Sequence, residues 1–155
     1  MLVLMLIIHG LLAVTLLGAI THQAFSVARR PRGAGAGPRS FFNRFGSVPA
    51  ASYANPIVIL FVATATMGAL LYPQYRIEVR TALEDLQLPV ANGVFEIKEH
   101  LIALGLGLLP SYWLYWRAPL APEHAGTRKY LTWLLAFLVW WGFLVGHVLN
   151  NIRGL

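Results

Sequence analysis

Four of the five histidines lie inside long apolar stretches of the sequence, where an ionisable side chain is costly and tends to have a function. When the stretches are threaded as antiparallel helices, His9, His100 and His147 each fall within about two helical turns of the same end. Neutral imidazole is a ligand for haem iron, copper, zinc and non-haem iron. The three side chains therefore predict one cofactor or metal site at this end, while His22 lies near the other end.

A b-type haem is the first candidate for this site. A haem with two axial histidines needs one from each of two neighbouring helices in a bundle. His100 and His147 come from consecutive apolar stretches, which favours them as the pair, with His9 as the alternative ligand. Arg76 and Arg80 precede the third stretch at the same end, and their guanidinium groups could pair with the haem propionates.

A metal ion is the rival occupant. Glu96 and His100 are four residues apart and share one helical face, and with His9 and His147 they would form a set of three histidines and one carboxylate. Such a set suits zinc, iron or copper. A third option is a proton or quinone site, in which Glu96, Glu99 and His100 would handle protons at the membrane surface. The chain has no cysteine, which excludes thiolate metal sites and covalent haem attachment.

The stretch 93–116 must position His100. On a helix, its positions 96, 100, 103, 107 and 111 share one face, and they read Glu, His, Ala, Gly and Ser. Such polar and small side chains belong against protein rather than lipid. We therefore expect this face to line the interior of a helical bundle.

The composition is that of an integral membrane protein, because 57% of the residues are hydrophobic and only 12% are charged. We expect a single membrane domain, residues 1–155, folded as an all-α antiparallel up-down bundle of four transmembrane helices. The expected spans are about 2–25, 56–72, 93–116 and 130–149.

The basic residues predict how this bundle is oriented. The connections after the first and third spans hold Arg29, Arg30, Arg32, Arg39, Arg44, Arg117, Arg128 and Lys129, and the opposite side holds Arg76, Arg80, Lys98 and Arg153. The positive-inside rule places the first group in the cytoplasm, so both termini are expected outside, in the periplasm of a bacterium with this protein in its inner membrane. The net charge of +6 is thereby explained without nucleic acid as a partner.

These expectations favour a small membrane b-type cytochrome, or the haem-bearing subunit of a larger respiratory complex. The layout resembles the four-helix membrane anchors of respiratory enzymes that carry b-haem. A subunit of an oxidoreductase complex is expected rather than an enzyme on its own. The loops are too short for a soluble catalytic domain, which favours the first of two alternatives. The alternatives are a non-catalytic accessory subunit, packed against other membrane subunits, and a protein for metal binding or transport.

Overall fold

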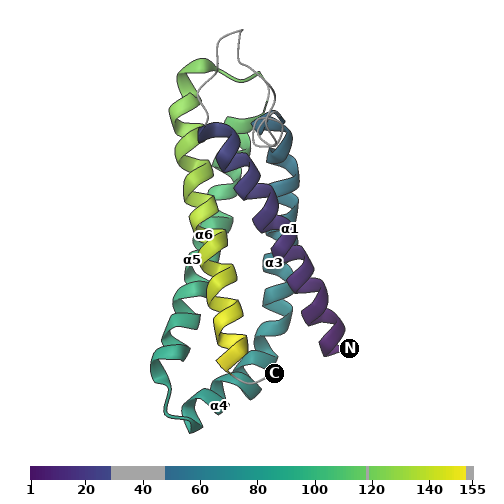
Figure 1. Ribbon diagram of the computed structural model, residues 1–155, viewed down its shortest axis with the longest axis vertical. Coiled ribbons are helices and arrows are strands. Elements are labelled where there is room, and N and C mark those ends of the chain that lie inside the picture. The colour runs from purple at the N-terminus through teal and green to yellow at the C-terminus, as the bar shows by residue number, and fades with distance from the viewer. Residues whose placement is uncertain (29–47, 118, 153–155) are drawn as a thin grey trace, which may run out of the picture.

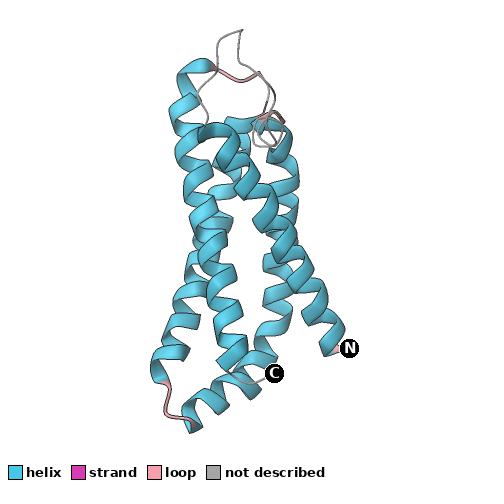
Figure 2. Ribbon diagram, in the orientation of Figure 1, coloured by secondary structure: helices cyan, strands magenta, loops and turns pink. Residues whose placement is uncertain are grey.

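The computed structural model describes residues 1–28, 48–117 and 119–152, and these residues form an all-helical bundle (Figure 2). Its long helices are α1 (Leu2–Ala28), α3 (Ala54–Gln74), α5 (Pro89–Trp116) and α6 (Ala125–Ile152). They run antiparallel in chain order, and both chain ends lie at the same end of the bundle as the short helix α4 (Arg80–Asp85) (Figure 1). We call this the α4 end. The opposite end, the loop end, carries the 3₁₀ helices Ala50–Tyr53 and Pro122–His124.

Three helical segments are long and apolar enough to cross a membrane, among the residues that the structure describes: Leu2–Ala28, Ala50–Asp85 and Pro122–Leu149. They indicate a lipid environment, because so much apolar surface remains uncovered within one chain. Helix α5 has 28 residues but is not among the three. Its first half carries Glu96, Lys98 and Glu99, and its second half carries Pro110 and four Tyr and Trp residues, which lower its hydropathy.

The helices extend beyond the expected spans. Helix α3 continues through Pro73 into a π-helical turn, Tyr75–Val79, and then into α4. Helix α5 begins at Pro89, which suits a first turn because proline lacks the N–H that would have no partner there. Of the residues that set the expected orientation, Arg29, Arg30, Arg32, Arg39, Arg44 and Arg153 lie outside the described residues.

The main core lies toward the loop end of the bundle. It joins the C-terminal half of α1, the N-terminal half of α3, the C-terminal half of α5 and the middle of α6, through Leu16, Ile20, Ala24, Ile57, Phe61, Leu109, Tyr112, Leu135, Leu138 and Val139. Gly105 is needed for this contact, because a Cβ atom there would overlap the ring of Phe61. A smaller cluster, made of Phe95, Val145 and Leu149, joins α5 to α6 at the α4 end. The first half of α1, by contrast, contributes no buried residue.

A set of buried hydrogen bonds, which we call the polar latch, crosses the main core. The Tyr112 hydroxyl donates to Gln23 Oε1 at 2.6 Å, and the Gln23 amide donates to the Ala50 carbonyl at 2.9 Å. Nearby, Trp116 Nε1 donates to the Thr132 hydroxyl at 3.1 Å. Gln23, Tyr112 and Thr132 are fully buried. These bonds satisfy polar groups that would otherwise be costly in an apolar interior, and they link α1, α5 and α6 in one register.

Candidate functional site

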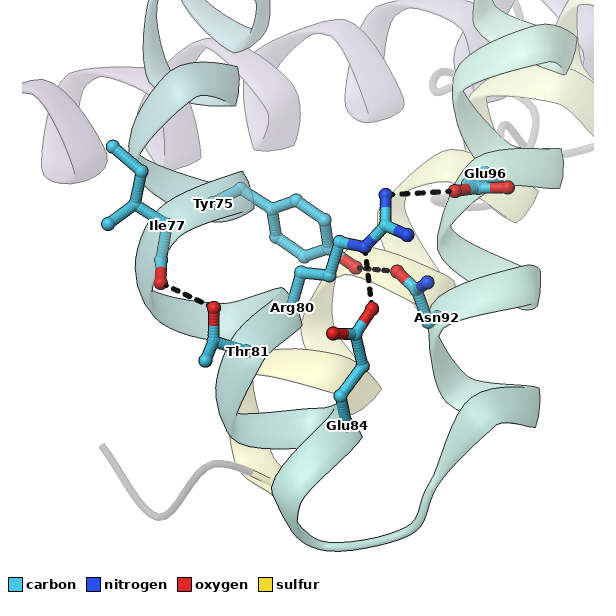
Figure 3. A network of polar contacts seen from close by, with 7 residues as sticks. All are labelled: Tyr75, Ile77, Arg80, Thr81, Glu84, Asn92 and Glu96. Carbon is cyan, nitrogen blue, oxygen red and sulfur yellow. Dashed lines mark hydrogen bonds and ion pairs between the residues drawn. The ribbon is translucent and has the colours of Figure 1, made fainter.

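The site expected from the sequence falls at the α4 end, where a cluster of polar side chains joins the helices (Figure 3). We call it the hairpin cluster: Tyr75 from the π-helical turn, Arg80 and Glu84 from α4, and Asn92 and Glu96 from α5. The chain reverses direction between α4 and α5 at residues 86–88, which brings these two helices side by side.

The local sequence explains why the chain bends here. Pro73 removes one N–H from the helical ladder, and the π-helical turn follows it two residues later. Gln87 adopts a left-handed conformation with φ of 56°, which ends α4. The Leu88 N–H then donates to the Leu83 carbonyl at 2.9 Å, which closes the turn before Pro89.

The hairpin cluster holds α4 against α5. Arg80 Nε lies 2.8 Å from Glu84 Oε1 on its own helix, and Arg80 Nη1 lies 3.8 Å from Glu96 Oε1 on α5. The Tyr75 hydroxyl donates to Asn92 Oδ1 at 3.2 Å, and the Tyr75 ring stacks on Phe95 with centroids 3.5 Å apart. Two residues expected to serve a cofactor, Arg80 and Glu96, are therefore paired with each other.

Lys98 and Arg76, two further cations at this end, also have partners within the chain. Lys98 Nζ lies 2.6 Å from Glu99 Oε1 and 4.0 Å from the centroid of the Phe95 ring. The guanidinium of Arg76, expected to bind a propionate, lies 6.0 Å from the centroid of the Tyr72 ring and is exposed. The hairpin cluster thus serves as a clamp between helices, in which the one cation, Arg80, contacts both carboxylates.

The three expected ligand histidines lie on three helices but do not converge. His100 is exposed, with Nδ1 2.7 Å from the Glu96 carbonyl oxygen. His147 is also exposed, with Nε2 3.2 Å from Asn151 Nδ2. His9 is half-buried against α3, where a Cβ atom on Gly68 would lie 3.4 Å from its Cε1. Across the described ranges, no group of three or more His, Asp or Glu residues could hold a metal ion.

The polar face of α5 points away from the bundle, so the expectation that it lines the interior is wrong. Glu96, His100, Ala103, Gly107 and Ser111 are all exposed. The face that packs inside consists of Gly105, Leu109, Tyr112 and Trp116. Large apolar and aromatic side chains fill the core, and Gly105 admits the ring of Phe61, so the volume of these groups decides the rotation of the helix.

Sequence reasoning also missed the residues that tie the helices together. Gln23 and Thr132 are polar positions within otherwise apolar stretches, and this interruption was the available signal. Their partners are Tyr112 and Trp116, aromatic residues near the end of an apolar stretch, where an aromatic belt at the membrane surface would be the usual interpretation. Both are buried and donate hydrogen bonds to those polar side chains.

These features make the protein a membrane-associated helical bundle. The hairpin cluster joins α4 to α5 at one end, and α5 has an exposed polar face. In comparison with known proteins, no family model, no curated protein and no solved structure matches this chain.

Proposed function

We propose that this protein is a non-catalytic accessory subunit of a larger membrane complex, and that the exposed face of α5 packs against a transmembrane helix of a partner. The observation that carries the proposal is the outward direction of Glu96, His100, Ala103, Gly107 and Ser111. Ionisable side chains on a membrane helix ordinarily face protein or water, so their position on the outer surface of this bundle indicates a covering protein.

The chemistry of this face suits helix packing. In lipid, helices associate through close van der Waals contact and hydrogen bonds, which small residues at intervals of four allow. Ala103, Gly107 and Ser111 have this spacing. A Cβ atom on Gly107 would meet nothing within 4 Å, so the space beside it is open to a partner backbone. The Ser111 hydroxyl adds a hydrogen-bonding group to the same surface.

Paired glycine variants test this proposal. Gly107→Leu should release the protein from its complex, because the larger side chain separates the two helices. Gly10→Leu is the matched control, since Gly10 lies on the exposed surface of α1 and its Cβ would also meet nothing within 4 Å. Native gels of membranes solubilised in mild detergent, probed for a tag on this chain, measure the complex.

The sizes on these gels decide the outcome. The wild-type protein and Gly10→Leu should migrate far above the 17.1 kDa chain, and Gly107→Leu should migrate near it. A wild-type monomer, or a band at a small multiple of the chain mass without another protein, would contradict an accessory role.

We also propose that α5 is a fourth span and that both termini lie on the periplasmic side of a bacterial inner membrane. Support comes from the antiparallel arrangement of α5 with α6 along the bundle and from the excess of basic residues in the connections at the loop end. The chain contains no cysteine, so single cysteines can be introduced without a background. A membrane-impermeant maleimide should label Thr81→Cys in intact spheroplasts and should label Gly126→Cys only after lysis. The opposite pattern would reverse the orientation, and labelling of both would remove the fourth span.

A b-type haem is a second proposal, placed at an interface with a partner because the histidines of one chain do not enclose a site. The observation that favours it is the contact between Nδ1 of the exposed His100 and the Glu96 carbonyl, which leaves Nε2 as the ring nitrogen for a ligand. Metal-bound histidines commonly have such a backbone partner. The intact complex should then show a b-type absorption band on reduction, which His100→Ala abolishes and His22→Ala retains. Absence of the band from the wild-type complex would exclude this proposal.

A further inference from the structure

A surface groove runs between α3 and α5 toward the loop end. It has a volume of about 340 Å³ and is lined by Val58, Val62, Leu106, Leu109, Pro110 and Trp113. The groove exists because α3 packs mainly on α1 and α5 packs mainly on α6, so the two helices are held apart on this side. Val62 and Leu106 remain 46% and 37% exposed within the chain, which leaves apolar surface for another molecule.

A polar bridge closes the groove at the loop end. Trp113 Nε1 donates to Asn55 Oδ1 at 2.9 Å, which links α5 to α3 across the groove. The Trp113 ring is 40% exposed, and an indole with one apolar edge and one bonded N–H is typical of the boundary between acyl chains and headgroups. The groove thus begins where lipid headgroups would lie and continues along the helices toward the acyl chains.

A cation lies over this bridge. The guanidinium of Arg117 is 5.0 Å from the centroid of the Trp113 ring, and its side chain is exposed. No carboxylate in the described part of the chain pairs with it. A guanidinium held on an aromatic face keeps donors free for an acceptor outside the chain, and its planar fork matches the oxygens of a phosphate.

We propose that the α3–α5 groove binds an anionic phospholipid, with one acyl chain between Val62 and Leu106 and the headgroup phosphate on Arg117. An apolar groove that leads to an uncompensated cation, Arg117, matches the acyl chain and the headgroup of such a lipid in order. A partner helix would also fill an apolar groove, but it would leave the charge of Arg117 unpaired. The groove adjoins the face of α5 proposed for protein docking, since Leu106 and Pro110 directly precede Gly107 and Ser111.

Lipid titration of the detergent-solubilised full chain, followed by native mass spectrometry, tests the site. The probes are phosphatidylglycerol and phosphatidylcholine with identical acyl chains, and glycerol 3-phosphate as a headgroup without chains. The first equivalent of phosphatidylglycerol should bind about fivefold more tightly than phosphatidylcholine, the ratio expected for one arginine near an anionic headgroup.

Two pairs of variants locate the binding. Arg117→Gln should abolish the preference for phosphatidylglycerol, whereas Arg76→Gln should retain it, because Arg76 is also an exposed arginine on an aromatic ring but lies at the α4 end. Val62→Trp should weaken both lipids by filling the groove. Val148→Trp is its control, because Val148 is similarly exposed and lines a separate groove of about 190 Å³ between α5 and α6.

Several results would overturn the proposal. Equal affinity for the two lipids removes the role of the cation, and equal losses from Arg117→Gln and Arg76→Gln would mean a diffuse charge effect. Binding of glycerol 3-phosphate as tight as that of the intact lipid would identify a site for free phosphate, without use of the groove. The tested positions are exposed, so the variants should fold, and an unchanged helical circular dichroism spectrum verifies this.

Discussion

The hydrogen bond between Tyr112 and Gln23 gives the most direct test of the packing described here. Tyr112→Phe removes the donor and keeps the ring. The Oε1 atom of Gln23 then loses its partner, while the amide of the same side chain still donates to the Ala50 carbonyl. Both side chains are fully buried, so water cannot replace the lost bond without disturbing the core.

The expected loss of stability follows from two limits. A buried polar group left without a partner costs about 1–3 kcal/mol in soluble proteins. Hydrogen bonds between membrane helices average about 0.6 kcal/mol and reach about 1.7 kcal/mol, because the unfolded chain also finds partners. The 2.6 Å distance and full burial place this bond near the upper membrane value. We expect Tyr112→Phe to lower the free energy of unfolding by about 1–2 kcal/mol.

A double-mutant cycle with Gln23→Leu isolates this bond from the loss of packing. Gln23→Leu alone should cost more than Tyr112→Phe, since it also leaves the Ala50 carbonyl without its donor. The double variant should cost less than the sum of the two, by about 1 kcal/mol. Unfolding in mixed micelles with increasing SDS, followed by circular dichroism, gives the free energies. Tyr130→Phe is the control, because Tyr130 is 81% exposed. Strict additivity of the two single variants would refute the bond.

Three further results are expected in the same assay. Gly105→Val should lower the free energy of unfolding by about 1–3 kcal/mol through overlap with Phe61, and Phe61→Leu should recover part of this loss; an unaffected Gly105→Val protein would contradict the close contact. Glu96→Gln should cost less than about 1 kcal/mol, because the side chains of Arg80 and Glu96 are 33% and 50% exposed, and a larger cost would mean that the pair is shielded from water. Gln87→Gly should raise stability by about 0.5–1 kcal/mol by relieving the left-handed conformation, and destabilisation would count against this turn.

The apolar helices could be predicted from the sequence because the hydropathy that indicates them lies within each segment. Apolar stretches of membrane length predict α1, α3 and α6. The expected level of His100 was wrong, because α5 begins at Pro89 and His100 lies about three turns, not two, from this start.

Rotation about each helix axis could not be predicted in the same way. On α5, polarity suggested that Glu96 and His100 face inward, but the fit of Gly105 against Phe61 turns the opposite face to the core. This fit depends on Phe61, which belongs to another helix, so the periodicity of residue types along α5 alone does not reveal it. The hairpin cluster was hidden for a similar reason, because Tyr75 and Asn92 meet only after the π-helical turn and the reversal at Gln87.

The uneven distribution of the core has a mechanical consequence. The helices are joined by the main core and its polar latch at the loop end, whereas at the α4 end the first half of α1 buries no side chain. Free energies of local opening follow the density of such contacts, so amide hydrogens in residues 2–15 should exchange before those in residues 16–24. The first half of α1 should therefore open before the rest of the bundle, because the hairpin cluster and the Phe95 cluster hold the other helices together at the α4 end.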